Sequence, residues 1–217
     1  MKVGVLGTGS VGRTIASGLL GLGHEVTMGS RWAESEALLE WLDEADETAR
    51  GGTFAEAAAA GELLFNCTSG GASLEALTAA GAENLADKVL VDVANPLDFS
   101  QGMPPTLGVC NDDSLGERIQ AAFPEAKVVK ALNTVNNQVM VDPGRVPGPH
   151  SVFVCGEDDG AKARVIELLT EFGWPRGSVI DLGGIEAARG TEMYLPLWLR
   201  LMGALETADF NIQVRVP

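Results

Sequence analysis

The chain has 217 residues, 46% of them hydrophobic, and its 30 acidic and 15 basic residues give a formal net charge of −15. This length and composition support one well-buried domain, or one domain with a small extension. The negative charge argues against nucleic acid and anionic membrane surfaces as partners, because both would repel the protein. Since the sequence shows no signal peptide and no apolar stretch of membrane-spanning length, we expect a cytoplasmic protein.

The sequence offers few residues for a metal centre. The three cysteines, Cys67, Cys110 and Cys155, show no CxxC or other metal-ligand spacing, and the chain has only two histidines. We therefore expect reduced thiols and no bound metal.

The first 31 residues predict strand, glycine-rich turn, helix and strand, in that order. A short apolar run ends in Gly7-Thr8-Gly9-Ser10-Val11-Gly12. In such a motif the first glycine permits the tight turn, the second lets a pyrophosphate approach the backbone, and the third allows close packing of helix on strand. The pyrophosphate then lies on free N–H groups at the helix N-terminus. A dinucleotide site is expected at Gly7, Thr8, Gly9, Ser10, Val11 and Gly12.

The second strand ends in Gly29-Ser30-Arg31, without the acidic residue that holds the ribose 2′-hydroxyl of NAD. A serine hydroxyl and a guanidinium suit a 2′-phosphate, which a carboxylate would repel. The pattern predicts NADP(H), with Ser30 and Arg31 at the phosphate. The alternative is that Arg31 is only a solvated loop residue.

Beyond this unit, short β-rich runs alternate with Ala- and Leu-rich helical stretches. This alternation predicts an α/β fold of the Rossmann type, a doubly wound, mainly parallel sheet with a small C-terminal helical or strand extension. Expected strands are Lys2–Leu6, Glu25–Met28, Leu63–Cys67, Val89–Val93, Val128–Ala131, Val152–Cys155 and Val179–Asp181. Expected helices lie near Gly12–Leu22, Ser35–Ala45, Phe54–Ala60, Ser73–Ala80, Leu115–Ala122, Gly160–Phe172 and Ile185–Thr207.

The strongest break in the chain is Pro143–Pro149, with the sequence PGRVPGP. It predicts a nucleotide-binding domain over residues 1–143 and a C-terminal extension over 144–217. The alternating tail Asp209–Val216 is expected to form a terminal strand.

Ligands of an open parallel sheet bind beyond the carboxyl ends of its strands. The loops that follow the later strands there are expected to add neutral cofactor contacts. The residues concerned are Cys67, Thr68, Ser69, Asn95, Pro96, Ala131, Asn133 and Thr134.

No Ser/His/Asp set and no carboxylate pair converges on these loops, and a carbonyl reductase needs a proton donor. The only candidates for that role are Lys130 and Asn133, and both are weak. The Lys130 side chain either faces the cofactor pocket or only caps the layer of the sheet in which it lies. Direct hydride exchange between two stacked redox rings needs no side-chain acid, because proximity and orientation suffice.

Four segments resemble the NADPH-dependent coenzyme F-420 reductases (8-hydroxy-5-deazaflavin:NADP oxidoreductases), and within them the bacterial subgroup of dinucleotide-binding reductases. These are the glycine turn, GHEVTMGSR at Gly23–Arg31, VVKALNTVNNQVMVDP ending at Pro143, and MYLPLWLRLMGALETADFNIQV at Met193–Val214. The resemblance implies that Ser30 and Arg31 bind the 2′-phosphate. It also implies that a deazaflavin meets the nicotinamide in a cleft shared with the C-terminal part.

Three functions remain open from the sequence. The first is hydride transfer between NADP(H) and a small redox acceptor, coenzyme F-420 or a flavin. The second is an imine or carbonyl reductase that uses Lys130 or Asn133. The third is a sensor that binds NADP(H) without turnover. The apolar stretch Leu195–Met202 is either core, or the lining of a ring pocket or of the dimer face of an expected homodimer.

Overall fold

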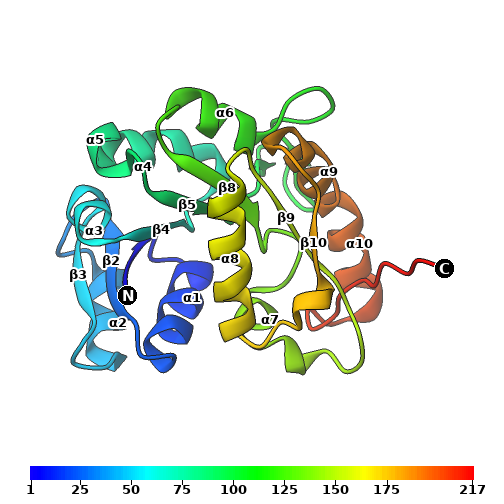
Figure 1. Ribbon diagram of the computed structural model, residues 1–217, viewed down its shortest axis with the longest axis horizontal. Helices are drawn as coiled ribbons and strands as arrows, with labels where there is room; N and C mark the ends of the chain where they lie inside the picture. Colours follow the sequence, from blue (N-terminus) through cyan, green and yellow to red (C-terminus); the bar gives the residue numbers. More distant parts are fainter.

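The computed structural model describes residues 1–217 and contains one large sheet with helices on both faces (Figure 1). Its strands are β1 (Lys2–Leu6), β2 (Glu25–Ser30), β3 (Arg50–Thr53), β4 (Leu63–Asn66), β5 (Val89–Asp92), β8 (Lys127–Ala131), β9 (Val152–Cys155) and β10 (Val179–Asp181). The main helices are α1 (Ser10–Gly21), α2 (Glu36–Glu44), α3 (Phe54–Ala60), α4 (Ser73–Ala80), α5 (Ala82–Leu85), α6 (Leu115–Ala122), α7 (Asn137–Val141), α8 (Asp159–Glu171), α9 (Ala188–Met193) and α10 (Leu195–Leu205). The predicted α/β, doubly wound architecture is confirmed.

The eight strands lie in the order β10-β9-β8-β5-β4-β1-β2-β3. From β1 the chain moves outward to β2 and β3, then returns to β4 on the other side of β1. The strand order therefore reverses between β1 and β4, which is where an open parallel sheet binds its ligand. The glycine turn follows β1 at this point.

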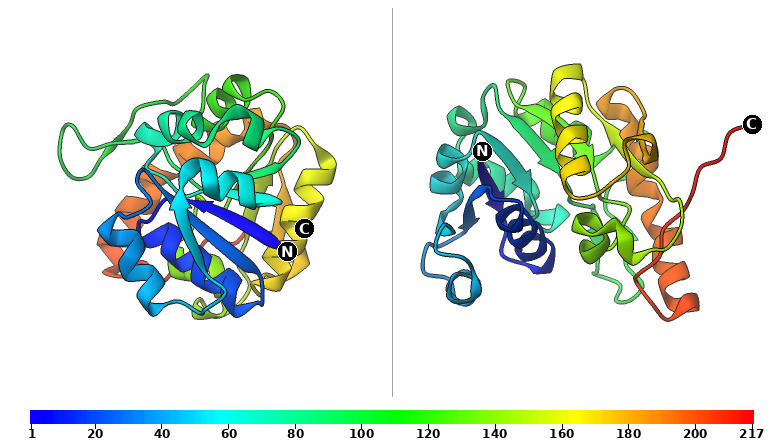
Figure 2. Two further views of the ribbon diagram at one scale, coloured as in Figure 1. Left: turned by 90° about the vertical axis from the view of Figure 1, so that its left-hand side faces the viewer. Right: turned by 60° about the horizontal axis from the view of Figure 1, so that its bottom comes forward.

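Each face of the sheet has its own hydrophobic core. One core includes Ile15 and Leu19 of α1 together with Leu168 of α8. The other includes Leu77 of α4 and Ile119 of α6. Central strands such as β4 are buried along their whole length, as expected for a parallel sheet covered on both faces. Figure 2 shows the sheet and the helices on its two faces from other directions.

The break at Pro143–Pro149 does not separate two folded units. The sheet continues through it, because β9 pairs with β8 and β10 pairs with β9. The pairing of β8 with β9 is antiparallel, whereas β1 to β5 and β8 pair in parallel. The segment 144–217 therefore completes the sheet before it forms the C-terminal helices.

Two C-terminal predictions were wrong. The single helix expected over Ile185–Thr207 is divided, because α9 ends at Met193 and α10 begins with Leu195 and Pro196, a residue without an amide hydrogen. The expected strand at Asp209–Val216 is absent. The tail is attached by single contacts, among them the ion pair of Arg145 with Asp209 at 2.6 Å and the Ser151 N–H, which donates to the Ile212 carbonyl at 2.8 Å. A strand needs a continuous ladder of such bonds.

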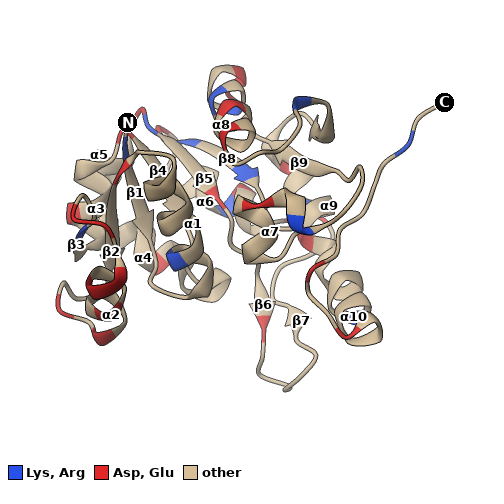
Figure 3. Cartoon of the chain, turned by 90° about the horizontal axis from the view of Figure 1, so that it is seen from below, with Lys and Arg blue, Asp and Glu red and all other residues tan.

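A small hairpin, β6 (Leu97–Asp98) with β7 (Thr106–Leu107), was not predicted. It projects from the edge where the parallel strands end, and Figure 3 shows it between the α4 side and α10. None of the helices combines the length and apolarity required to cross a bilayer.

Candidate dinucleotide site

The glycine turn is held by close backbone packing. Gly7 has φ +118°, and a Cβ atom there would lie 2.8 Å from the Cys67 carbonyl oxygen. A Cβ at Gly12 would lie 2.0 Å from the Gly7 carbonyl oxygen. The turning role predicted for Gly7 and the packing role predicted for Gly12 are therefore confirmed. No atom lies within 4 Å of a Cβ built on Gly9, so this glycine faces open space above the turn.

The N-terminus of α1 offers free donors beside that open space. Gly9 is the N-cap and carries no capping side chain. The first hydrogen bond of the helix runs from the Arg13 N–H to the Gly9 carbonyl, at 3.0 Å. The amides of Ser10, Val11 and Gly12 thus lack a partner within the helix, and the helix dipole is positive here. A pyrophosphate fits this arrangement of glycine and amides.

A cavity of about 400 Å³ extends from the turn past the end of β2 to helix α4. It contains predicted residues of the glycine turn, of the end of β2 and of the loop after β4, and it adds several that were not predicted. Its lining consists of Gly7, Thr8, Gly9, Ser30, Arg31, Trp32, Ser35, Phe54, Cys67, Thr68, Ser69, Ala72, Glu75, Ala76 and Ala79. Ala72, directly before α4, and Ala76 and Ala79 within it put small side chains on this side of the cavity, a pattern that leaves room for a flat base.

Ser30, Arg31, Trp32 and Ser35 surround the outer end of this cavity. The Ser30 hydroxyl donates to the Trp32 carbonyl, accepts a hydrogen bond from the Trp32 N–H at 3.2 Å and lies 2.9 Å from the Ser35 hydroxyl. The exposed Arg31 guanidinium lies 5.3 Å from the centroid of the Trp32 ring. No acidic residue occupies the end of β2, so two hydroxyls and one cation can meet a 2′-phosphate. Trp32 and Ser35 were missed because they lie beyond the strand end on which the motif is based.

A second cavity, of about 240 Å³, shares Cys67, Thr68 and Ser69 with the first. It continues along the ends of the next strands and is suited to the other half of a dinucleotide. Its lining is Val11, Cys67, Thr68, Ser69, Gly70, Val93, Ala94, Asn95, Leu97 and Phe99. Every side chain in it is uncharged, as expected for these loops.

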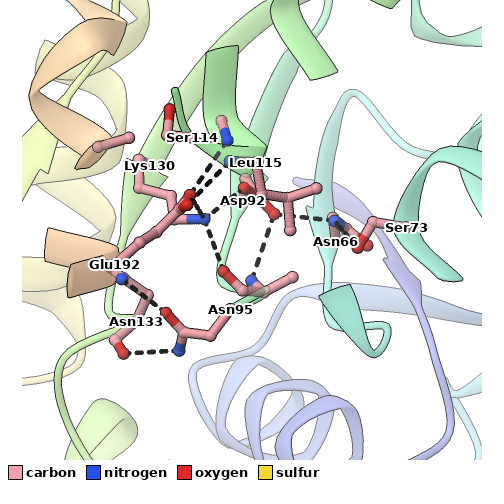
Figure 4. Close-up of polar contacts among 12 residues, drawn as sticks. Asn66, Ser73, Asp92, Asn95, Ser114, Leu115, Lys130, Asn133 and Glu192 are labelled. Atoms are coloured by element: carbon pink, nitrogen blue, oxygen red, sulfur yellow. Dashed lines mark hydrogen bonds and ion pairs between the residues drawn. The ribbon is translucent and has the colours of Figure 1, made fainter. Parts of the chain in front are cut away.

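The floor of this second cavity is fixed by a buried hydrogen-bond network (Figure 4). The Asn66 amide donates to Asp92 at 2.8 Å and to the Ser73 hydroxyl at 3.1 Å. The Thr68 hydroxyl donates to the Asn66 side-chain oxygen at 2.6 Å. Asn95 and Asn133 form a reciprocal pair, in which Asn95 donates to the Asn133 carbonyl and Asn133 donates to the Asn95 side-chain oxygen, both at 2.9 Å.

Lys130 does not face either cavity. Its side chain is fully buried, and its ammonium contacts Asp92 at 2.7 Å, Glu192 at 2.7 Å and the Ala94 carbonyl at 2.6 Å. Burial acts to lower the pKa of Lys130, but the two carboxylates outweigh it and raise the pKa above its ordinary value. All three N–H bonds of the ammonium are used, so this geometry favours the structural alternative over the proton donor.

Glu192 was not predicted as part of this arrangement. One carboxylate oxygen accepts from the Leu115 N–H at 2.8 Å, and the other accepts from the Gly116 N–H at 3.1 Å. Glu192 therefore caps the N-terminus of α6 and pairs with Lys130 at the same time. A single glutamate within a helical stretch carries no sequence signal for such a role.

The cysteine thiols are not activated. Cys67 lines both cavities, but burial, and then the nearby Asp92 carboxylate, raise the pKa of its thiol far above the ordinary value. Burial also raises the pKa of Cys155, to about 12. Both thiols stay protonated near neutral pH and are poor nucleophiles.

The remaining predicted contacts lie behind or beside the cavities. Ala131, Asn133 and Thr134 are buried and do not line the two cavities; Asn133 acts there through Asn95. Pro96 lines a neighbouring groove with Leu97. Ser10 and Gly12 contribute backbone N–H groups rather than a cavity wall.

Comparison with known proteins agrees with this geometry. A family described as coenzyme F420-dependent NADP oxidoreductase matches residues 2–96. The chain is 57% identical to a protein from Arthrobacter sp. FB24, whose crystal structure is provisionally described as that of an F420-dependent NADP reductase. The two structures share a TM-score of 0.94, and each chain is covered in full.

More distant proteins share part of the sequence or the fold. The chain is 31% identical over 205 residues to the metalloreductase STEAP3 of Rattus norvegicus. The matched region covers 91% of this chain and 38% of that protein. The chain thus spans about two fifths of the length of this curated relative. A reductive aminase from Aspergillus terreus, solved with NADPH and ethyl-5-oxohexanoate, is 19% identical with a TM-score of 0.66, over 94% of this chain and 62% of the other. That likeness shows the fold alone.

Proposed function

Since the chain belongs to the coenzyme F420-dependent NADP oxidoreductase family, whose members are NADP-dependent oxidoreductases, we propose that it transfers hydride directly between NADP(H) and a deazaflavin or flavin. The observation that carries this proposal is the uncharged second cavity beyond the glycine turn. A ring bound there meets no free acid or base. Direct transfer between two rings needs none, because the protein contributes binding and orientation.

The residues of the first cavity fit NADPH, which would supply the hydride. The amides of Ser10, Val11 and Gly12 would hold the pyrophosphate, and Ser30, Arg31 and Ser35 would hold the 2′-phosphate. Thr68 and Asn95 are fixed by hydrogen bonds in the second cavity and would orient the nicotinamide.

The imine or carbonyl reductase alternative is less well supported. The Lys130 ammonium is already bound to two carboxylates and a carbonyl, and the Asn133 side chain is bound to Asn95. Neither group is free to protonate a substrate. The expected homodimer, and the expected contribution of residues 144–217 to the acceptor cleft, stay predictions.

Replacing Arg31 with alanine is expected to weaken NADPH binding far more than NADH binding. The guanidinium lies exposed at the outer end of the first cavity, where only NADPH carries a phosphate. Loss of one charged hydrogen bond costs about 1.5–3 kcal/mol, so the Kd for NADPH should rise roughly 10- to 150-fold. Isothermal titration of both cofactors measures the difference.

Arg31→Lys is the matched control, since it keeps the charge and loses the planar fork. It should fall between the wild type and Arg31→Ala. Equal losses for NADH and NADPH in Arg31→Ala would show that this residue does not recognise the phosphate.

The acceptor is tested by mixing the protein with NADPH and separate candidates while the nicotinamide absorbance is followed. The candidates are coenzyme F420, FMN, FAD and a small cyclic imine or ketone. Oxidation with the deazaflavin or a flavin is the expected result. Oxidation with the imine or ketone and with neither ring acceptor would contradict direct ring-to-ring transfer. Tight NADPH binding without oxidation by any acceptor would instead favour the sensor.

A further inference from the structure

A buried charged cluster connects the C-terminal helices with the loop that lines the second cavity. It consists of Asp92 at the end of β5, Lys130 in β8 and Glu192 in α9, and all three side chains are essentially inaccessible to solvent. None of them lines either cavity. Of this cluster, only Asp92 belongs to the network beneath the second cavity, through its hydrogen bond from Asn66.

The Lys130 ammonium contacts the cavity loop directly. It donates to the carbonyl of Ala94 at 2.6 Å, and the Ala94 N–H in turn lies 3.3 Å from Asp92. Ala94 and its neighbour Asn95 both line the second cavity. The backbone before Asn95 is thus held at both the N–H and the carbonyl of Ala94.

The Asn95 side chain is held by Asn133, which lies in the loop that follows β8. Asn133 follows Lys130 by three residues, after Leu132, which adopts the left-handed backbone conformation at φ +63°. That turn directs Asn133 back to the reciprocal pair with Asn95. A Cβ on Gly70 would also lie 2.1 Å from the Asn95 carbonyl oxygen, so the loop has no room to move on that side.

Glu192 keeps the ammonium in place. Its carboxylate is anchored by two backbone N–H groups of α6 and presents one oxygen to Lys130 at 2.7 Å. Because the anchor is a helix N-terminus, the carboxylate cannot follow Lys130 if the lysine moves. Figure 4 shows the chain of contacts from Glu192 through Lys130 to the Ala94–Asn95 loop.

We propose that Lys130, fixed by Glu192, is a positioning residue that sets the Ala94–Asn95 loop and thereby the nicotinamide. The proposal rests on the NADP(H) binding of the proposed function, and it adds a role for the C-terminal helix α9 in the nicotinamide half of the site. Lys130 touches neither cofactor nor acceptor. Its effect is expected on nicotinamide geometry and not on adenosine binding.

The experiment uses two probes that require no acceptor. The affinity of 2′,5′-ADP reports on the adenosine half, and the fluorescence change of NADPH on binding reports on the nicotinamide. In Lys130→Met and Glu192→Gln, 2′,5′-ADP affinity should match the wild type, whereas the NADPH emission should move toward that of free NADPH. Asn95→Ala should give the same signature, because Asn95 is the last link of the chain of contacts.

Lys162→Met is the matched control. Lys162 is another little-exposed lysine paired with two carboxylates, Asp181 at 3.0 Å and Asp159 at 3.1 Å, on α8 and away from both cavities. It should keep the wild-type signal of both probes. With any acceptor that the wild type reduces, kcat of Lys130→Met should fall about 100-fold with little change in the KM for NADPH, as for a ring misplaced by about 1 Å.

Equal responses of Lys130→Met and Lys162→Met, or parallel loss of both probes in a folded Lys130→Met, would overturn the positioning role. If Lys130→Met does not fold, Glu192→Gln decides, since it removes the carboxylate that fixes the Lys130 ammonium and leaves Lys130 as the partner of Asp92. A wild-type NADPH signal in Glu192→Gln refutes the proposal. Absence of NADPH binding by the wild type would overturn the proposed function as well, a result distinguishable from these.

Discussion

Replacing Lys130 with methionine is expected to lower the free energy of unfolding by about 3–5 kcal/mol, the usual cost of leaving a buried carboxylate without its partner. Here two carboxylates, Asp92 and Glu192, lose the same cation at once. Each keeps other donors: Asn66 for Asp92, and two amides of α6 for Glu192. These donors keep the loss from being larger. Chemical denaturation monitored by circular dichroism measures the change.

The pH dependence of stability provides a second test of the contacts of Lys130 with Asp92 and Glu192. The folded-state pKa of Lys130 is raised above the ordinary value of 10.5, so its stabilising contribution is fully present below that pH. It is lost as the pH rises through the raised value. The stability difference between the wild type and Lys130→Met should therefore stay constant near neutral pH and shrink only above about 10.5.

Lys162→Met is again the control, and its loss should be smaller because Asp159 and Asp181, its partners, are solvent-accessible. Equal losses in the two variants would contradict the special position of Lys130. Wild-type stability of Lys130→Met would show that the cluster contributes nothing net.

Replacing Gly12 with alanine is expected to destabilise the protein by about 3 kcal/mol, the upper end for overpacking, and to abolish NADPH binding. The new Cβ would lie 2.0 Å from the Gly7 carbonyl oxygen, which belongs to the turn itself. Neither α1 nor the end of β1 can move away without displacing the amides that would hold the pyrophosphate. Thermal unfolding and NADPH titration measure the two effects.

Two other glycines separate the steric cause from a general effect of alanine. Gly21, at the exposed end of α1, has open space around its Cβ position, so Gly21→Ala should keep wild-type stability and binding. Gly9→Ala should also fold, but its methyl would occupy the space above the helix N-terminus and weaken NADPH. A stable Gly12→Ala that binds NADPH would refute the close packing.

Local patterns determined much of the fold in advance. β1, β9, β10, α3, α4 and α6 begin and end where the periodicity and turn residues predict. The glycine motif and the acid-free end of β2 likewise placed Gly7, Gly9, Ser30 and Arg31 in one cavity. Each of these features depends on neighbours in the chain, either through the period of a strand or helix or through the conformation of one turn.

The tertiary structure alone decided the remainder. Periodicity could not show that Pro196 would divide the last helical stretch into α9 and α10, or that the tail would find no strand partner. Trp32, Ser35 and the alanines at and before α4 line the first cavity only because of how these distant segments pack.

Lys130 shows most clearly what could not be predicted from the sequence. From the sequence it was either a proton donor or a structural residue. The answer came from Asp92 and Glu192, which the fold brings to it from β5 and α9. The protonation and role of a buried ion depend on which charges and dipoles surround it, and those are set by contacts between distant segments. The sequence by itself predicted which turn would bind a dinucleotide; only the packed structure decided which groups around that turn are free to act.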